Sequence, residues 1–238
     1  MSVEGVPASA GAPLAEALVA VIRAHAAELS AIDGAIGDGD HGVNMTKGFG
    51  MAADRIGSRQ VSVSEALQII ADTLLADIGG AMGPLYGTFL GEMAAASAGT
   101  DVIDASTVEG MLDRGVDAVL ELGGARVGDK TLIDVLVPAR AAFRHSRASG
   151  ATMDQALAAM AEAAERGKES TRDLVAMIGR ASRLGERSRG TLDAGAVSCS
   201  LLLGAFAQTL RGAITPPAER HRADRSAAQP ESRPQATG

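Results

Sequence analysis

The sequence has almost no aromatic residues and a single cysteine. Among 238 residues there is no tryptophan, one tyrosine and four phenylalanines, so small and aliphatic residues and nine methionines must fill the core. Small side chains let helices approach closely, and few of these residue types favour strands. Cys199 alone cannot form an internal disulfide or a cysteine-based zinc site. These absences favour a helical protein, and nothing in them points to an oxidising compartment.

Long apolar runs and excess positive charge are missing as well. No apolar run approaches the roughly 20 residues that span a bilayer, and the N-terminus lacks the basic and apolar regions of a signal peptide. The formal net charge of -7 disfavours nonspecific binding of nucleic acid. We therefore expect a cytoplasmic protein that binds neither a membrane nor nucleic acid.

Apolar residues recur with helical spacing through most of the chain, and this pattern predicts eight helices. The sixth contains Pro138, which either kinks the helix or marks a late start, and the seventh is interrupted near Gly167. Residues 1–12 are interpreted as an N-terminal extension, and residues 216–238, rich in Pro, Arg, Gln and Ser, as a disordered tail. The helices of the predicted domain, residues 13–215, are expected at 13–33, 43–56, 62–77, 84–97, 106–123, from 131 onward, 152–179 and 194–210.

The fold class expected from these elements is all-α, an antiparallel up-and-down barrel of eight helices. In that arrangement alternate loops share one end of the barrel, and glycine is distributed unequally between the ends. The connections at 57–61, 98–105 and 148–152 hold one glycine each. Those at the other end hold four, three, three and three glycines, in segments 34–42, 79–83, 123–128 and 185–195.

The glycine-rich end also collects the N-termini of the second, fourth, sixth and eighth helices. Helix N-termini carry partial positive charge and free N–H groups, and glycine lets the backbone approach a bound group, so we expect a phosphate-type anion site. Asp33, Asp38 and Asp40 crowd into the first of these loops. Three carboxylates beside a phosphate site are explained if divalent cations such as Mg²⁺ lie between them.

Other interpretations of these motifs fit the sequence less well or remain open. Gly37, Gly39 and Gly42 spell GxGxxG, but a helix and not a strand precedes them, and "GGARVGDKT" lacks the strand of a P-loop. The aspartate spacing does not match an EF-hand, and simple turn formation by Asp-Gly pairs is the plain alternative. His41 is a candidate phosphate or base contact, metal ligand or helix-start residue, while Arg180 either contacts phosphate or belongs to a solvated basic face.

Four ordered motifs resemble the DAK2 or DhaL family, the nucleotide-binding L subunits of dihydroxyacetone kinase. They are "IGDGDHGVNMTKGF", "IGGAMGPLYGTFL", "GDKTLIDVLVPA" and "GRASRLGERSRGTLDAG". The resemblance runs from about residue 14 to 213 and implies a barrel of eight antiparallel helices that binds ADP and two Mg²⁺ at one end.

The resemblance also implies roles for individual residues. Asp33, Asp38 and Asp40 would hold the two magnesium ions. The family usually has a small hydroxyl residue, a methionine and a proline where Met82, Val137 and Ala194 stand. The residues implied to surround ADP or ATP are His41, Gly42, Val43, Asn44, Ala81, Met82, Gly128, Val137, Arg180, Asp193, Ala194 and Gly195.

The function implied by the resemblance is phosphoryl transfer without a protein nucleophile. Bound ADP would be phosphorylated by a phosphohistidine of an M subunit, and the resulting ATP would phosphorylate dihydroxyacetone held by a K subunit. A homodimer is also expected. Two alternatives stay open: an ATP-dependent kinase subunit for a short ketose such as erythrulose, and a nucleotide-loaded regulatory module.

Overall fold

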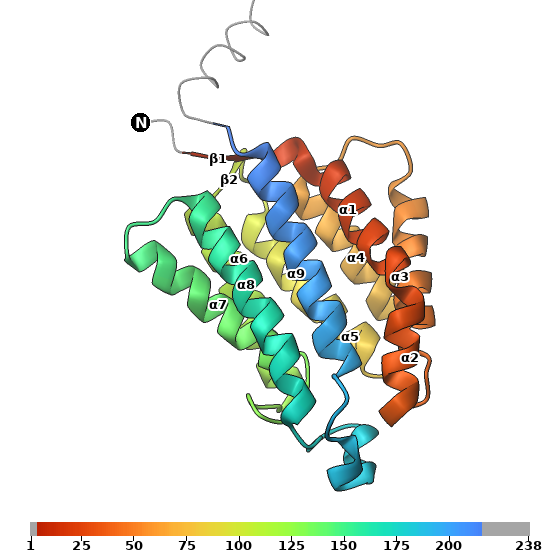
Figure 1. Cartoon of the computed structure of the whole chain (residues 1–238). Helices are drawn as coiled ribbons and strands as arrows, with labels where there is room; N and C mark the ends of the chain where they lie inside the picture. The colour runs from red at the N-terminus through yellow and green to blue at the C-terminus, as the bar shows by residue number, and fades with distance from the viewer. Residues whose placement is uncertain (1–3, 216–238) are drawn as a thin grey trace, which may run out of the picture.

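The computed structural model describes residues 4–215; residues 1–3 and 216–238, the latter being the predicted tail, lie outside the described part. Within residues 4–215, nine α-helices, three short 3-10 helices and two three-residue strands form one bundle (Figure 1). Their bounds are β1 Gly5–Pro7, η1 Ala8–Ala10, α1 Gly11–Ala24, α2 Ala26–Ile36, α3 His41–Ile56, α4 Val63–Asp77, α5 Met82–Ser97, β2 Val102–Asp104, α6 Ala105–Gly123, α7 Ile133–Ala148, α8 Met153–Ser170, η2 Thr171–Asp173, η3 Ala181–Ser188 and α9 Ala194–Ala213.

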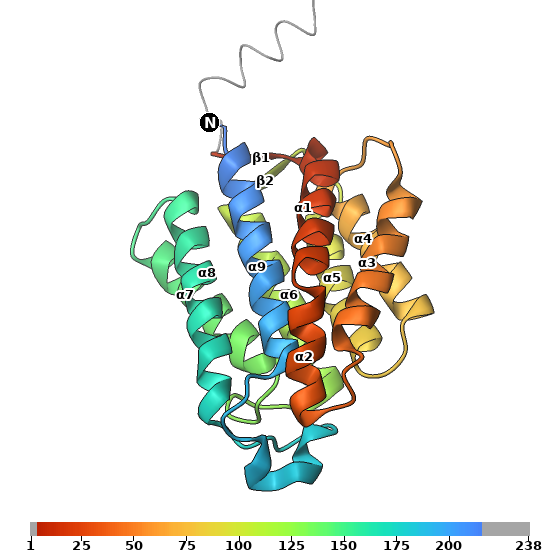
Figure 2. The same cartoon turned by 45° about the vertical axis from the view of Figure 1, so that its right-hand side comes forward.

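The helices run up and down and pack largely in chain order. Contacts join α3 to α4, α4 to α5, α5 to α6, α7 to α8 and α8 to α9, and α9 lies beside α1, which closes the ring. Figure 2 shows α9 between α8 and α1 in a second view. The expected all-α antiparallel barrel is therefore confirmed. In the described part of the chain, no helix is both long enough and apolar enough to cross a membrane.

The first predicted helix is two helices, α1 and α2, separated at His25. His25 has φ -105° and ψ 10°, outside helical geometry, although its N–H still donates to the Val21 carbonyl at 3.2 Å. Its imidazole lies 2.8 Å from the Glu28 carboxylate, in the first turn of α2. Since neither glycine nor proline stands at this position, the local sequence contained no signal for the break.

The interruption predicted near Gly167 is wrong, because α8 continues through that residue to Ser170. Gly167 instead permits close packing: a Cβ atom there would lie 2.3 Å from the carbonyl oxygen of Asp134 in α7. Pro138, four residues after Asp134, lies inside α7 and has no N–H to offer that carbonyl. The glycine of α8 therefore faces the carbonyl that the proline of α7 leaves free.

A small sheet holds the N-terminal segment against the bundle. Strand β1 pairs antiparallel with β2, with Val6 opposite Ile103, and both side chains are fully buried. Gly5 also forms a bridge with Thr215, beyond the end of α9. Residues 5–12, interpreted from the sequence as part of an extension, are thus packed at the end of the barrel opposite the glycine-rich loops (Figure 1).

Candidate functional site

Three carboxylates converge between α2 and α3. Asp33 lies in the last turn of α2, while Asp38 and Asp40 lie in the connection to α3. One oxygen from each lies within 4.8 Å of the other two. Glycine makes this loop possible, because a Cβ atom at Gly37 would lie 2.3 Å from the Asp33 carboxylate, and Gly39 has a φ of +79°. The sequence correctly predicted that these aspartates form one group.

The donor set of this group suits a hard divalent cation. All three ligands are carboxylate oxygens, which Mg²⁺ prefers, at a distance of about 2.0–2.1 Å. The limit of 4.8 Å between these oxygens is compatible with the roughly 4.2 Å that opposite ligands of one such ion span. Asp38 and Asp40 are exposed, so their side chains can adjust to one ion, or two ions can share the three carboxylates.

Arg180 is the positive group at this carboxylate cluster. Its guanidinium Nη1 contacts the Asp38 carboxylate, although the two residues are 142 positions apart in the chain. Both side chains are about half exposed, so this ion pair contributes little to stability. The ion pair matters for its position, because it brings the guanidinium of the α8–α9 connection to the carboxylate cluster between α2 and α3.

Four helices begin at the end of the barrel that carries the aspartates. Figure 1 shows the starts of α3, α5, α7 and α9 together at this end, as the glycine distribution predicted. Neither Asp40 before α3 nor Ala81 before α5 caps its helix with a side chain. By contrast, the Asp193 carboxylate accepts a 2.7 Å hydrogen bond from the N–H of Ala196 and so caps α9. Helices α3 and α5 therefore offer uncapped N–H groups to an anion.

Gly128 lies in the α6–α7 connection but does not offer its N–H to a ligand. That N–H donates to the Asp134 carboxylate at 2.5 Å, and the other oxygen of Asp134 accepts from the N–H of Thr131 at 2.7 Å. Gly128 has a φ of +103°, which few other residues tolerate. Gly128 therefore determines the shape of the loop. The buried Asp134, which accepts the hydrogen bonds that hold this loop, was not predicted from the sequence.

His41, the first residue of α3, contacts both the carboxylate cluster and helix α9. Its N–H donates to the Asp33 carboxylate at 3.3 Å, and its Nε2 lies 2.8 Å from the Ser198 hydroxyl of α9. The Ser198 oxygen lies 2.6 Å from the Tyr86 hydroxyl oxygen, and the Tyr86 hydroxyl donates to the Gly195 carbonyl at 2.9 Å. Burial lowers the pKa of His41, and the smaller effect of the Asp33 charge opposes this change. The lowered pKa favours the neutral imidazole.

Tyr86 and Ser198 were missed because both lie in apolar stretches, "GPLYGTFL" and "AGAVSCSLLL", that look like core helix. A useful signal was that Tyr86 is the only tyrosine of the chain. A buried tyrosine hydroxyl needs a hydrogen-bonding partner. Burial also raises the pKa of Tyr86 well above its ordinary value, so this hydroxyl keeps its proton.

The other residues expected at the site differ in exposure. Val43 is 65% exposed, whereas Met82 and Ala194 are buried at the starts of α5 and α9. Val137 lies in the second turn of α7 and packs against the core. Leu132, which precedes α7 and was not singled out from the sequence, lies against the start of α9: a Cβ atom at Gly195 would lie 3.9 Å from that of Leu132. The remaining expected residues, Gly42, Asn44 and Ala81, stand at the starts of α3 and α5.

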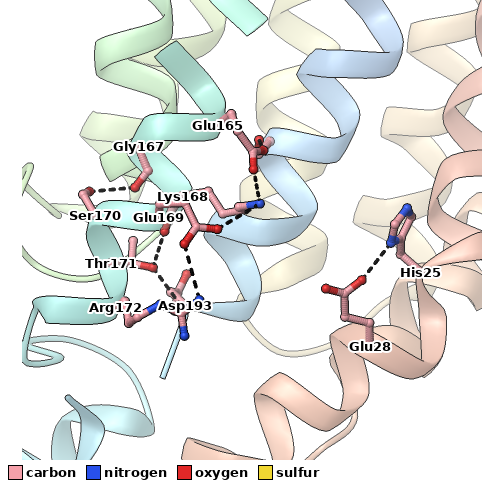
Figure 3. Close-up of polar contacts among 11 residues, drawn as sticks. His25, Glu28, Glu165, Gly167, Lys168, Glu169, Ser170, Thr171, Arg172 and Asp193 are labelled. Atoms are coloured by element: carbon pink, nitrogen blue, oxygen red, sulfur yellow. Dashed lines mark hydrogen bonds and ion pairs between the residues drawn. The ribbon is translucent and has the colours of Figure 1, made fainter. Parts of the chain in front are cut away.

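Asp193 is the most electrostatically perturbed acid of the site. Burial raises its pKa to about 6, and the Ala196 N–H and the nearby Lys130 ammonium oppose this effect. Figure 3 shows Asp193 beside Thr171, whose hydroxyl oxygen accepts a 3.0 Å hydrogen bond from the Asp193 N–H. A carboxyl with this pKa exchanges its proton near neutral pH.

Comparisons with known proteins agree with the motifs. The DAK2 domain matches residues 35–208. The ADP-binding subunit DhaL of the PEP-dependent dihydroxyacetone kinase of Escherichia coli K12 is 37% identical over 176 residues, which cover 74% of this chain and 84% of that subunit. The L-erythrulose kinase of Pectobacterium atrosepticum is 33% identical over 198 residues, which cover 82% of this chain but 34% of that enzyme.

A solved structure shares the fold. The dihydroxyacetone kinase from C. freundii, in complex with AMP-PNP and Mg²⁺, superposes with a TM-score of 0.62 at 24% identity, over 83% of this chain and 33% of that kinase. The match thus spans most of the DhaL subunit and a third of the longer kinases. By the extent of the domain match and the identity to DhaL, this chain belongs to the DAK2 domain family.

Proposed function

We propose that this chain is the nucleotide-binding subunit of a dihydroxyacetone kinase, with ADP as a resident cofactor and two Mg²⁺. The observation that carries the proposal is the convergence of Asp33, Asp38 and Asp40 at the uncapped N-termini of α3 and α5. Carboxylates and free N–H groups together suit a magnesium–diphosphate complex, because the carboxylates bind the metal and the N–H groups bind phosphate oxygens. The named relatives that match over most of their length are ADP-binding subunits.

In the proposed reaction, a phosphohistidine of an M subunit phosphorylates the bound ADP, and the γ-phosphoryl group then passes to dihydroxyacetone on a K subunit. The bound magnesium would neutralise charge on the phosphates. The residues of this chain would bind and orient: Asp33, Asp38 and Asp40 hold the metal, His41 and the following N–H groups border the phosphates, and Arg180 supplies a further positive charge. A neutral His41 suits hydrogen bonding to phosphate and does not suit a role as nucleophile.

Docking of partner subunits at the same end is supported by the distribution of exposed apolar side chains. In the described part of the chain, all six large apolar residues that are exposed lie in or next to the connections at this end, on α3, α4, α6 and the loops after α6 and α8. They are Val43, Leu75, Leu122, Val127, Met177 and Ile178. Exposed apolar groups gathered around a polar site are typical of a protein interface.

A second candidate is an ATP-dependent kinase subunit for erythrulose. It is favoured by the erythrulose kinases among the relatives, including the L-erythrulose 1-kinase of Mycolicibacterium smegmatis, 36% identical over 187 residues. Those 187 residues cover 32% of that enzyme, so the remainder of it has no counterpart in this chain. In this alternative the nucleotide exchanges with ATP in solution after each turnover.

One experiment tests the proposal and separates the two candidates. The protein is mixed with a K-type subunit and dihydroxyacetone or erythrulose, with either a phosphohistidine donor and catalytic ADP or free ATP alone. The proposal predicts many turnovers with the first donor and about one with the second, since release of an enclosed Mg–nucleotide breaks several charge-assisted hydrogen bonds. Sustained turnover with ATP alone would establish the alternative, and absence of adenine nucleotide binding in Mg²⁺ would exclude both.

A further inference from the structure

The connection between α8 and α9 is a loop whose two ends meet. Residues 172–190, here called the lid segment, leave the end of α8 and return to the start of α9. At its neck the N–H of Gly190 donates to the Arg172 carbonyl at 2.8 Å. Arg189 adds a hydrogen bond from its guanidinium to the Asp173 carbonyl. These contacts bring the two ends of the lid segment together and close its neck.

The lid segment reaches across the candidate site. It carries Arg180, which contacts Asp38 at the carboxylate cluster. Nearer its start, the N–H of Met177 donates to the carbonyl of Asp129 at 3.1 Å, in the α6–α7 connection. The segment therefore bridges two of the loops that border the proposed nucleotide site, and the position of Arg180 depends on how the segment is held.

One buried lysine joins both ends of the lid segment to the α6–α7 connection. The ammonium of Lys130 donates to the carbonyl of Thr171 at 2.5 Å and also to that of Thr191. These residues directly precede and follow the segment (Thr171 is labelled in Figure 3). Lys130 is only 2% exposed, and within the described residues no carboxylate lies within ion-pairing distance of its ammonium.

Lys130 occupies this place at a cost. Its φ is 63°, and it is the only residue other than glycine with a positive φ in the described part of the chain. Burial also lowers the pKa of its ammonium, with Asp193 opposing the effect. Left-handed geometry and a buried ammonium are both unfavourable unless the surrounding contacts compensate for them. Two carbonyl acceptors at the neck of a loop provide such contacts.

We propose that Lys130 is a positioning residue, which holds the neck of the lid segment closed and so keeps Arg180 at the carboxylate cluster. Its effect on nucleotide retention rests on the function proposed above. Its effect on the lid segment does not, because the contacts involved are all within the protein. Loss of the Lys130 ammonium should therefore loosen residues 172–190 while the rest of the barrel stays folded.

The test compares Lys130→Met, which keeps a long unbranched side chain but removes the ammonium, with Lys168→Met as a matched control. Lys168 lies on α8 and pairs with Glu165 and Glu169, not with the neck of the lid segment (Figure 3). Hydrogen exchange of the nucleotide-free proteins should be about tenfold or more faster in residues 174–189 of Lys130→Met and unchanged in α4. Trypsin cleavage after Arg180, Arg183 and Arg187 should accelerate in parallel, with no such change in the control.

Dissociation of a fluorescent ADP analogue in Mg²⁺ supplies the second readout. It should be about tenfold or more faster in Lys130→Met, but unchanged in Val108→Ala, a core change at the opposite end of the barrel that lowers stability. Unchanged exchange in residues 174–189 would overturn the proposal. Faster exchange with unchanged ADP dissociation would overturn the positioning role. If the wild-type protein binds no nucleotide, the proposed function fails, and exchange alone decides the role of Lys130.

A second variant covers the case in which Lys130→Met does not fold. Arg189 is about half exposed and contributes a hydrogen bond to the same neck, so Arg189→Ala should leave the core intact. We expect exchange in the lid segment to increase severalfold in this variant, less than in Lys130→Met, because the Lys130 contacts remain. Exchange indistinguishable from that of the wild type would overturn the proposal.

Discussion

The Nε2 atom of His41 lies 2.8 Å from the Oγ atom of Ser198, although 157 positions separate the two residues in the chain. This contact joins the start of α3 to the start of α9, and both helices begin at the candidate site. Tyr86 holds Ser198 from the other side at 2.6 Å. Because a neutral imidazole carries its hydrogen on only one ring nitrogen, the contact can fix both the orientation and the tautomer of His41.

Replacing Ser198 with Ala should release the His41 ring. The ¹⁵N shifts of His41 should move from those of one tautomer toward an average of two, and affinity for Mg–ADP should fall about twofold to tenfold, the usual effect of one neutral hydrogen bond. Ser200→Ala is the matched control, since the Ser200 hydroxyl donates to the Glu165 carboxylate of α8 and not to His41. Identical His41 shifts in the wild type and Ser198→Ala would contradict this interpretation.

Asp38→Asn and Asp40→Asn should abolish magnesium-dependent binding of ADP, because each change removes one of the three carboxylates proposed to hold the metal. Binding is measured by calorimetry with and without Mg²⁺. Asp72→Asn controls for loss of negative charge, because Asp72 is exposed on α4 and accepts a hydrogen bond from Gln68. If both variants bind Mg–ADP as the wild type does, the metal ligands lie elsewhere.

Gly167→Ala should destabilise the fold, since its Cβ would lie 2.3 Å from the Asp134 carbonyl. We expect a loss of about 1–3 kcal/mol in the free energy of unfolding, measured with urea. Gly110→Ala, in α6, places its Cβ in open space and should be neutral or stabilise by up to about 1 kcal/mol. A neutral Gly167→Ala would show that α8 shifts at little cost.

Asp193 should make the wild type more stable at mildly acidic pH. Its folded pKa of about 6 exceeds the ordinary value of 3.8, so the folded state binds a proton more tightly than the unfolded state. The resulting stabilisation is present at low pH and is lost as the pH rises through about 6. Unfolding at pH 5 and pH 7, without Mg²⁺, should therefore show a larger decrease in stability for the wild type than for Asp193→Asn. Equal decreases would mean that Asp193 titrates normally.

Cys199 should be chemically inert in the folded protein. It is 1% exposed in the second turn of α9, and burial raises the pKa of its thiol far above the ordinary value. A disulfide reagent such as DTNB reacts with the thiolate, so the native protein should not react at pH 8 and should release one equivalent after denaturation. Stoichiometric reaction before denaturation would show that the start of α9 opens readily.

Much of the fold and the polar loop could be predicted from the sequence, because these features depend on local patterns. Helical periodicity, the capping box at Ser62 and Glu65, and the glycines at alternate connections predicted the barrel and the end that carries the site. The capping box is present, with the Glu65 N–H bonded to the Ser62 hydroxyl at 3.1 Å. The grouping of Asp33, Asp38 and Asp40 followed because eight consecutive positions can hardly separate them.

Other features depended on tertiary structure, because they join residues that no local pattern relates. The break at His25 has no residue that signals it, and Gly167 looked like an interruption until its contact with α7 was seen. In the same way, Lys130 is one of three lysines, and no local pattern distinguishes it until folding brings the Thr171 and Thr191 carbonyls to its ammonium. Composition and residue spacing therefore determined which helices form and which loop carries the cluster of aspartates. Packing decided which polar groups are buried, and burial in turn selects their partners, because a buried polar group must find a hydrogen bond within the fold.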